Sequence, residues 1–432
     1  MYGSYMKTTL THIVPALAPQ MDGIGDYALN LAQHLRQAHG IESRFIVCDP
    51  QWDGPSRVEE FGVRRLRIRT EAGIWSLLAS TKEQSSAVLL HYAGAGYHKL
   101  GVPLWLYLGI KSWLAEGASG NSAETKQFST VFHELWSSSD KPWEKDFYLG
   151  VLQRRLVQGF HHLSKLSVAG TRRMQALLED LEPRKTLWLP MPSNMPSCER
   201  PKTGSHRPGP LRVAIFGQNS SRVASVRAHA NLLGALQKKN LLGSAMLIGK
   251  GLEATGPATA DLDLLQKCVG RERIEVMGEL SPKEVAVSLG KADLFLSHHG
   301  GEQACKSGAF MAALAAGCTG VLRDGQNAVP LHESEHFIAS DDSPASVERL
   351  ERMRAQGEWH RIAAAGRLWY ERHADWKVIA REYQEAMFQE GDRCEASAGS
   401  TQAAPEPVKA WTSRARPAAS LIADLPPQKS PL

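Results

Sequence analysis

The first residues that could do chemistry are two aspartates and two glycines in the segment 22–26, which reads Asp-Gly-Ile-Gly-Asp. An apolar run at 10–17 precedes them and a helical pattern begins at Tyr27, so the order is strand, glycine loop, helix. Two closely spaced glycines let a ligand approach the backbone, and a helix start offers unpaired N–H groups to an anion. Asp26 is the expected N-cap of this helix. The segment indicates an anion or sugar site or, equally, a tight turn that needs glycine.

Two histidines follow directly after predicted strands in the first half of the chain. His133, with Glu134 beside it, comes after the run 129–132, and His91 comes after the run 87–90. A side chain at the carboxyl end of a parallel strand can reach the crevice where ligands bind. An imidazole there can orient a hydroxyl group or hold a phosphate oxygen. The alternative for each is a buried histidine with a structural role.

The second half carries basic residues after its predicted strands. Arg222 follows the strand 211–216 and suits a pyrophosphate, because a guanidinium fork matches phosphate oxygens; otherwise it is a surface arginine. Lys250 stands between two glycines in a similar loop. A helix rich in small residues begins near Lys306 and Ser307, and its N-terminus together with that lysine would attract a diphosphate.

The polar residues just before that helix are His298, His299 and Glu302. Glu302 can accept hydrogen bonds from the hydroxyl groups of a ribose or a sugar. The cluster also suggests a metal site. Adjacent histidines on a strand point to opposite faces, however, so no metal is expected here.

These residues depend on strands and helices that alternate along both halves of the chain. The predicted strands are 43–48, 63–68, 87–91, 129–132, 166–169, 186–189, 211–216, 245–249, 273–277, 294–297 and 319–322. Such alternation predicts an α/β fold with parallel sheets, and a helix is expected at 171–181. The apolar, aromatic segment 103–114 is too short to span a membrane and is expected to be a buried or cleft-lining helix.

Composition divides the chain into domains. Six prolines lie in the window 190–210, where they predict a linker. The expected domains are 1–195 and 211–390, joined by a linker at 196–210 and followed by a disordered tail at 391–432 that is rich in Ala, Ser and Pro. Two such halves are expected to form a cleft between the carboxyl ends of their sheets.

Overall composition favours an ordinary soluble protein: 432 residues, 43% hydrophobic, with a formal net charge of +5. No basic run with interleaved aromatic residues occurs, so nucleic acid is not an expected partner. The six cysteines are scattered and lack CxxC spacing, which predicts reduced thiols and a cytoplasmic location. The basic residues of the tail leave open a peripheral contact with the inner face of a membrane.

With these residues assembled, the region 7–390 resembles the GT-B glycosyltransferases, and most closely the large retaining group often called family 4. The matching features are the glycine loop before a YxxxLAxxL helix at 23–35, the strand ending in His133-Glu134, the stretch 277–297, the small-residue helix ending at 312–317, and the aromatic pattern at 366–383 that is similar to the family's last helices.

The resemblance implies two Rossmann-like domains facing each other across a cleft, with the last helices crossing back to the first domain. It implies transfer of a sugar from a UDP- or GDP-linked nucleotide sugar to a glycan or lipid-linked acceptor, with retention, in polysaccharide or glycoconjugate assembly. Neither a metal nor another cofactor is implied. His133 and Glu302 would be catalytic, with His133 orienting the donor sugar. The other implied site residues are Gly23, Gly25, Arg222, Lys250, Lys306 and Ser307 for the donor and its phosphates, and Asp22, Asp26 and His91 on the acceptor side.

One departure from the family supports a competing hypothesis. The family usually carries two glutamates eight residues apart around the small-residue helix that ends at 312–317, and Ala304 and Ala312 stand at those positions. The alternative is therefore a catalytically degenerate GT-B protein that acts as a nucleotide-binding or scaffolding module. A sugar-nucleotide epimerase of the same fold has no feature in this sequence that favours it.

Overall fold

The computed structural model describes residues 9–388 except 21, 81–86, 120–125, 138–140, 142, 185, 197–208 and 253–258. Residues up to Gln389 form one compact unit. The predicted disordered tail at 391–432 and most of the predicted linker at 196–210 lie outside the described residues. Both therefore stay predictions, as do the domain boundaries that depend on them.

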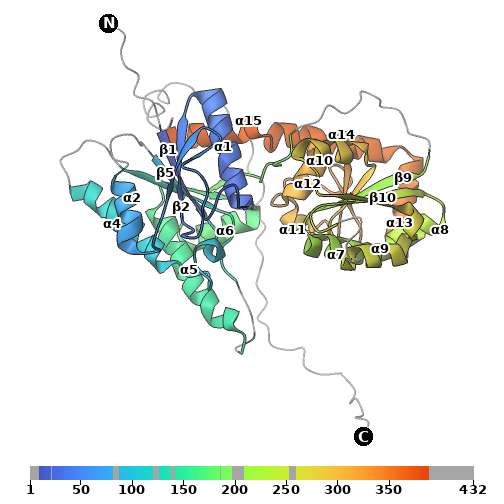
Figure 1. Cartoon of the computed structure of the whole chain (residues 1–432). Helices are drawn as coiled ribbons and strands as arrows, with labels where there is room; N and C mark the ends of the chain where they lie inside the picture. Colours follow the sequence, from blue (N-terminus) through green and yellow to red (C-terminus); the bar gives the residue numbers. More distant parts are fainter. Residues whose placement is uncertain are drawn as a thin grey trace, which may run out of the picture. The chain divides into compact units, whose positions relative to one another are not determined.

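The first lobe is built on an eight-stranded sheet in the order β3-β4-β2-β1-β5-β6-β7-β8. Figure 1 labels β1, β2 and β5 of this sheet. Its neighbouring strands run parallel except for β3 and β4. The strands are β1 (Thr9–Val14), β2 (Glu42–Val47), β3 (Arg57–Val58), β4 (Phe61–Arg65), β5 (Ala87–Tyr92), β6 (Gln127–Phe132), β7 (Leu166–Ala169) and β8 (Thr186–Trp188).

Helices cover both faces of this sheet. One apolar cluster joins a face of the sheet to α2 (Glu71–Ala79), α4 (Leu104–Ser119), α5 (Lys145–Leu163) and α6 (Arg172–Leu181). A second cluster joins the other face to α1 (Gly23–His39) and to α15 (Trp376–Phe388), the last helix described. The short α3 (Gly94–Tyr97) follows β5 directly.

The second lobe has a six-stranded parallel sheet in the order β11-β10-β9-β12-β13-β14. Its strands are β9 (Leu211–Phe216), β10 (Leu242–Ile248), β11 (Ile274–Gly278), β12 (Leu294–Leu296), β13 (Thr319–Leu322) and β14 (Ile338–Ala339). Two apolar clusters pack helices on its faces: α10 (Pro282–Lys291) and α12 (Gly308–Ala315) on one, and α7 (Asn219–Ala228), α8 (Ala230–Lys238), α9 (Ala260–Val269) and α13 (Pro344–Ala355) on the other, while α14 (Glu358–His373) contributes to both. The predicted pair of parallel α/β halves is confirmed.

The start of α1 differs from the prediction. Its N-cap is Asp22, whose carboxylate accepts hydrogen bonds from the N–H groups of Ile24 (3.4 Å) and Gly25 (3.2 Å). Asp26 lies in the first turn, so the cap prediction for Asp26 is wrong. A Cβ atom on Gly25 would lie 2.3 Å from the carbonyl oxygen of Ala16, so this glycine lets the helix approach the segment after β1. The glycines thus belong to the helix, and two of the amides expected to meet an anion already have an acceptor.

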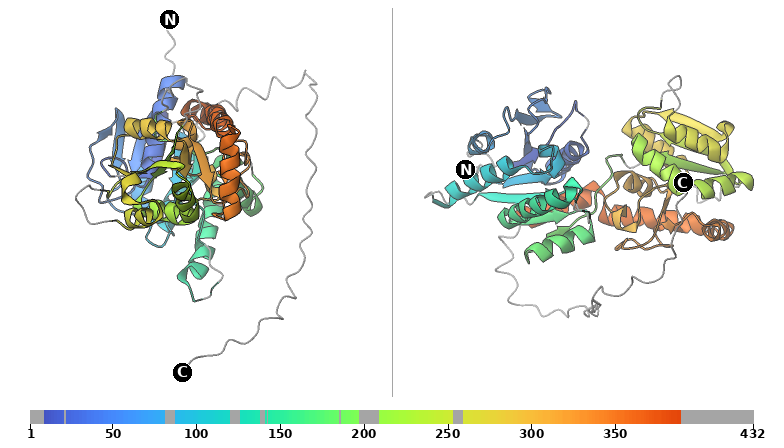
Figure 2. Two further views of the ribbon diagram at one scale, coloured as in Figure 1. Left: turned by 90° about the vertical axis from the view of Figure 1, so that its right-hand side faces the viewer. Right: turned by 90° about the horizontal axis from the view of Figure 1, so that it is seen from below.

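The last two helices of the described chain connect the lobes. α14 packs on α12 and β13 of the second lobe, and α15 packs on α1 of the first. Figure 2 shows the fold from two further directions, with these helices in orange to red. The hydroxyl groups of Tyr27 and Tyr383 lie 3.1 Å apart, and both side chains are buried. Trp376 Nε1 donates to the carbonyl oxygen of Ser193 (2.8 Å), and the N–H of Ser193 donates to the Tyr370 hydroxyl (3.2 Å).

The chain leaving β8 also contacts the second lobe. The N–H of Met191 donates to the carbonyl oxygen of Cys305 (2.8 Å), just before α12. Met191 and Ser193 belong to the proline-rich window in the sequence. The backbone of the described start of that window is therefore hydrogen-bonded to the backbone of the second lobe and to side chains of the crossing helices.

Replacing Tyr383 by Ala removes a fully buried ring from the α15 packing, and we expect the free energy of unfolding to fall by about 3–5 kcal/mol. Tyr383→Phe keeps the ring and loses only the hydroxyl contact with Tyr27, which should cost about 1 kcal/mol. Urea denaturation followed by circular dichroism measures both. Leu368→Ala is the control, because Leu368 is 44% exposed on α14 and its loss should change stability by less than about 0.5 kcal/mol. A Tyr383→Ala protein as stable as this control would contradict the packing.

Candidate functional site

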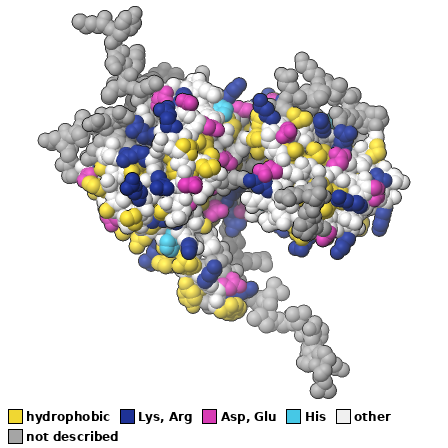
Figure 3. Space-filling view, viewed as in Figure 1, with side chains coloured by type: hydrophobic (Ala, Val, Ile, Leu, Met, Phe, Trp, Pro, Cys, Tyr) yellow, Lys and Arg dark blue, Asp and Glu magenta, His cyan; other side chains and the backbone are white. Residues whose placement is uncertain are grey.

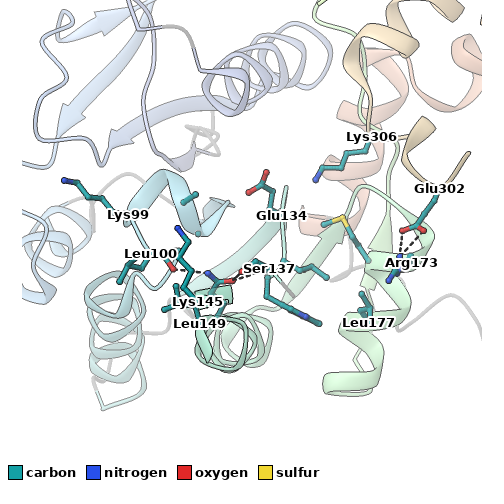
Figure 4. Close-up of a pocket in the computed structure, with 17 residues that line it drawn as sticks. Lys99, Leu100, Glu134, Ser137, Lys145, Leu149, Arg173, Leu177, Glu302 and Lys306 are labelled. Atoms are coloured by element: carbon teal, nitrogen blue, oxygen red, sulfur yellow. Dashed lines mark hydrogen bonds and ion pairs between the residues drawn. The ribbon is translucent and has the colours of Figure 1, made fainter. Parts of the chain in front are cut away.

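A cavity of about 550 Å³ lies at the junction of the two lobes (Figure 4). Four basic side chains and two carboxylates line it, a net charge of +2: Lys99, Lys145, Arg173, Lys306, Glu134 and Glu302. The apolar part of the lining consists of Leu100, Leu135, Trp136, Leu149, Met174 and Leu177. Walls of these two kinds suit an anionic group attached to a less polar body.

The charged residues of the lining, apart from Lys145 on α5, follow the carboxyl ends of parallel strands. Lys99 follows β5 and α3, Glu134 follows β6, and Arg173 stands in α6 after β7. Glu302 and Lys306 follow β12, Glu302 within the short α11 (Gly301–Ala304). Because parallel strands bring these ends to one edge of a sheet, residues distant in the sequence meet at the cavity.

Arg173 and Glu302 form an ion pair between the two lobes. Arg173 Nη1 lies 2.9 and 3.0 Å from the two carboxylate oxygens of Glu302, as the dashed lines in Figure 4 mark. The Arg173 side chain is 66% exposed, so the pair adds little stability and can open for a ligand at small cost.

Lys306 extends into the cavity in the direction of Glu134 (Figure 4). Burial lowers the pKa of the Lys306 ammonium group, and the carboxylate of Glu134 opposes that shift. Charges in a partly buried site interact more strongly than charges in water. Lys306 is therefore the cation of this lining best placed to hold an anionic ligand group.

Beside Glu134 in the chain begins a buried row of three histidines that crosses the first sheet. His12 on β1, His91 on β5 and His133 after β6 are each at most 4% exposed. His12 Nδ1 lies 3.0 Å from His91 Nε2, and His91 Nδ1 lies 3.3 Å from His133 Nε2. At the far end, His12 Nε2 lies 3.2 Å from the Ser43 hydroxyl. The neighbouring rings are stacked.

Burial keeps the three imidazoles of this row neutral. It lowers the pKa of His12 to about 3 and that of His91 well below the usual value. Burial also lowers the pKa of His133 to about 3, with a further contribution from the charge of Lys306. A neutral imidazole has one donor and one acceptor nitrogen, so both hydrogen bonds of the row must point the same way. That common direction decides whether His133 Nδ1 carries a proton.

This arrangement corrects the prediction that His91 lies on the acceptor side of the site. Its side chain is fully buried, and its two ring nitrogens face His12 and His133. It does not line the cavity. The structural alternative, rather than a place on the acceptor side, therefore describes His91, and we leave it out of the proposed site.

The prediction that Arg222 binds a pyrophosphate is also corrected, because Arg222 lies inside the second lobe. Its fully buried side chain pairs with Asp261 and donates to the carbonyl oxygens of Gly217 (2.6 Å) and Lys250 (3.1 Å). A Cβ atom on Gly249, whose φ is +140°, would lie 2.5 Å from Arg222 Nη1, so the glycine makes room for the guanidinium. The guanidinium holds the loops after β9 and β10 together and is not available to a pyrophosphate.

Other predicted donor residues have partners within the protein as well. Lys250 Nζ lies 3.1 Å from a carboxylate oxygen of Glu279, with both side chains more than half exposed. Ser307 caps α12, and its hydroxyl accepts the N–H of Phe310 (3.3 Å). Further predicted residues that do not line the cavity are His133, Asp22, Gly23, Gly25 and Asp26.

The two adjacent histidines of the second lobe, His298 and His299, are not oriented as the sequence predicts. β12 ends at Leu296, so His298 and His299 lie beyond the strand, and their ring centroids are 4.0 Å apart rather than on opposite faces. His298 Nδ1 lies 3.2 Å from the Ser225 hydroxyl, and His299 Nδ1 lies 2.8 Å from Gln303 Oε1. Within the described part of the chain, no group of three or more His, Cys, Asp or Glu residues is arranged to hold a metal ion.

Glu302 and Lys306 of the lining are predicted by the sequence pattern, whereas three of its basic residues are not. Lys99 and Arg173 each follow a predicted strand, but with some residues between. A search for polar residues that continued into the first turn of the following helix would have found them. Lys145 begins a helix far from any predicted strand end, and nothing in the sequence marked it.

Lower pH is expected to destabilise the first lobe through the buried histidines. An unfolded histidine binds a proton below about pH 6.5, whereas folded His12 has a pKa of about 3. Between these values the unfolded state holds more protons than the folded state. For each such histidine, the free energy of unfolding therefore decreases by about 1.4 kcal/mol for each unit by which the pH is lowered. We expect His12→Gln to reduce the slope by about that amount between about pH 5 and 6, measured by urea denaturation. His373→Gln, at an exposed position, is the control; equal slopes in the two variants would refute the assignment.

No family model and no curated protein sequence matches this chain. Solved structures do match it. A glycosyltransferase from Rickettsia africae ESF-5 has a TM-score of 0.60 at 13% identity, covering 89% of this chain and 100% of that one. Sucrose-phosphate synthase from Thermosynechococcus elongatus has a TM-score of 0.59 at 14% identity, covering 89% and 99%. The alpha,alpha-trehalose 6-phosphate synthase from Burkholderia multivorans has a TM-score of 0.56 at 11% identity, covering 93% and 100%. Identities this low bear on the fold alone, and the chain has a GT-B glycosyltransferase-like fold.

Proposed function

We propose that this chain is a glycosyltransferase. It moves a sugar from a UDP- or GDP-linked donor to a glycan or lipid-linked acceptor in polysaccharide or glycoconjugate assembly. One observation carries the proposal: a cavity with net positive charge lies where strand ends of both lobes meet. A nucleoside diphosphate is the anionic ligand that this position in paired α/β sheets suits. The similarity in fold to solved glycosyltransferases supports the same assignment.

Lys306 is the residue that we assign to the leaving diphosphate. During transfer, the bond between the anomeric carbon and the diphosphate oxygen breaks, and negative charge grows on the departing phosphate. Lys306 reaches the cavity from the second lobe, and Arg173 reaches it from the first, so both can stabilise this charge. Glu302 becomes free to accept ribose or sugar hydroxyls once the ligand displaces Arg173 from their ion pair.

His133 is assigned to the orientation of the donor sugar rather than to proton removal. The departing phosphate takes the proton of the acceptor hydroxyl, so no separate base is required and the acceptor attacks from the face that the phosphate leaves. This proposal predicts retention. Because the histidine row has one common direction, His133 presents a fixed donor or acceptor nitrogen. Closure of the two lobes over the donor would exclude water from it.

A specific observation favours the second candidate, a catalytically degenerate nucleotide-binding or scaffolding protein. Ala304 and Ala312 stand where the family usually carries glutamates. They are 0% and 2% exposed and belong to one apolar cluster of the second lobe. These positions are part of the core and contribute no carboxylate to the cavity.

We expect UDP or GDP, or one of their sugar conjugates, to raise the melting temperature of the full chain without added magnesium. A ligand at about 100 times its dissociation constant adds roughly 2.7 kcal/mol to stability, which a thermal-shift panel detects readily. Lys306→Met should weaken this binding roughly tenfold or more, since it removes a charge-assisted contact. Lys283→Met, at an exposed position on α10, is the matched control. Absence of any shift with every nucleotide would refute nucleotide-sugar use.

His133→Ala separates the two candidate functions. In a transferase, we expect it to abolish transfer of radiolabelled sugar while nucleotide affinity stays within a few-fold, because His133 acts on the sugar and not on the nucleotide. A scaffold has no transfer activity to lose. Thermal unfolding of the variant checks that the first lobe remains folded. Unchanged turnover would remove His133 from the mechanism.

A further inference from the structure

The described surface carries a concentration of exposed apolar side chains at one place, the beginning of α5. We call this set the α5 stripe: Trp143 (80% exposed), Phe147 (40%), Tyr148 (63%), Val151 (56%) and Leu152 (51%). The first turns of α5 project from the lobe in Figure 1, and Figure 3 shows hydrophobic side chains gathered on that projection. Large apolar side chains usually occur singly on a soluble surface, so such a set marks an interaction site.

Helical spacing places the stripe on one side of α5 and the cavity on another. Phe147, Tyr148, Val151 and Leu152 follow an i, i+1, i+4, i+5 pattern, which lies on one face of a helix. Lys145, Leu149 and Gln153, spaced by four residues, line the cavity. One helix therefore carries both the stripe and part of the cavity wall.

Basic side chains accompany the stripe. Arg154 and Arg155 are exposed on the same helix, and Arg154 lies over the ring of Trp136. The carboxylate of Glu144 lies 3.2 Å from Lys141 Nζ, which balances its charge. A projecting helix with Trp, Tyr and Phe next to Lys and Arg matches a bilayer surface, where aromatic rings sit at the headgroup level and cations meet anionic lipids.

We propose that the α5 stripe is a peripheral docking surface for an anionic lipid bilayer. None of the described helices could cross a membrane, so the contact would be one of insertion at the interface. A second copy of the chain is a poorer occupant. A stable protein interface takes about 20–30 residues a side, whereas the stripe has five side chains on a projecting helix end.

This surface limits the kinds of acceptor that the proposed transferase would use, and in that respect the inference rests on the proposed function. With Tyr148 and Leu152 in the headgroup region, the cavity wall formed by Leu149 on the same helix lies next to the bilayer. An acceptor anchored in the membrane can then reach the cavity with its polar end. The structure thus favours a lipid-linked acceptor over a free glycan.

Vesicle co-sedimentation of the full chain tests the docking surface directly. We expect binding to vesicles containing phosphatidylglycerol, much less binding to pure phosphatidylcholine, and a decrease at high salt because the basic side chains are screened. Trp143→Ser combined with Tyr148→Ser should lower the partition coefficient roughly tenfold or more, since both rings leave the interface. Val287→Ser combined with Leu368→Ser, two exposed apolar residues of the second lobe, is the matched control and should bind as the unchanged chain does.

Three results would overturn the proposal. The first is an unchanged chain that binds no vesicles. The second is a stripe variant that binds as well as the control. The third is a stripe variant whose only defect, measured by light scattering after gel filtration, is loss of a dimer. Thermal unfolding confirms that the variants are folded.

The test is independent of the proposed reaction. Vesicle binding that depends on the stripe, in a chain whose melting temperature responds to no nucleotide, would refute the transferase and leave the docking surface standing. A nucleotide response without vesicle binding would do the reverse.

Discussion

The packing of α15 on α1 is the contact on which the candidate site depends. The cavity is lined from both lobes, so it exists only while the lobes hold their relation to one another. The exposed ion pair between Arg173 and Glu302 is too weak to fix that relation. The buried contact of Tyr27 with Tyr383, together with the hydrogen bond from Trp376 to Ser193, supplies apolar area that the ion pair lacks.

Two neighbouring residues at the end of β6 show how environment separates chemical roles. His133 turns into the sheet, where burial keeps its ring neutral and joins it to the histidine row. Glu134 turns into the cavity, where it faces the ammonium group of Lys306. The end of β6 therefore supplies a neutral imidazole, His133, and a carboxylate, Glu134, that opposes the lowering of the Lys306 pKa. A ligand in the cavity would meet Glu134 directly, whereas His133 is buried and does not line the cavity.

Much of the fold could be predicted from the sequence, because buried parallel strands are continuous apolar runs with few alternatives. β7, β9 and β13 have the predicted bounds, whereas β3 and β14 were missed because each has only two residues. The site was harder to predict. Arg222 and Lys306 both follow strands, but Arg222 meets the buried carboxylate of Asp261, which lies 39 positions along the chain and on no shared pattern. Tertiary partners of this kind leave no local signal, and neither does His12, an apparently ordinary member of an apolar strand.

The crossing of the last helix has a consequence for synthesis of the chain. Leu10 of the first sheet, together with Leu31 and Leu35 of α1, belongs to one apolar cluster with Ile379 and Tyr383 of α15. The ribosome makes the first lobe early, yet the side chains of α15 that complete this cluster arrive only after the second lobe has been made. The nascent first lobe therefore presents an uncovered apolar surface throughout synthesis of the second, and the lobe made first is the last to be completed. Chaperones should accordingly bind the nascent chain at this surface. Truncated chains that lack α15 should leave the same surface exposed.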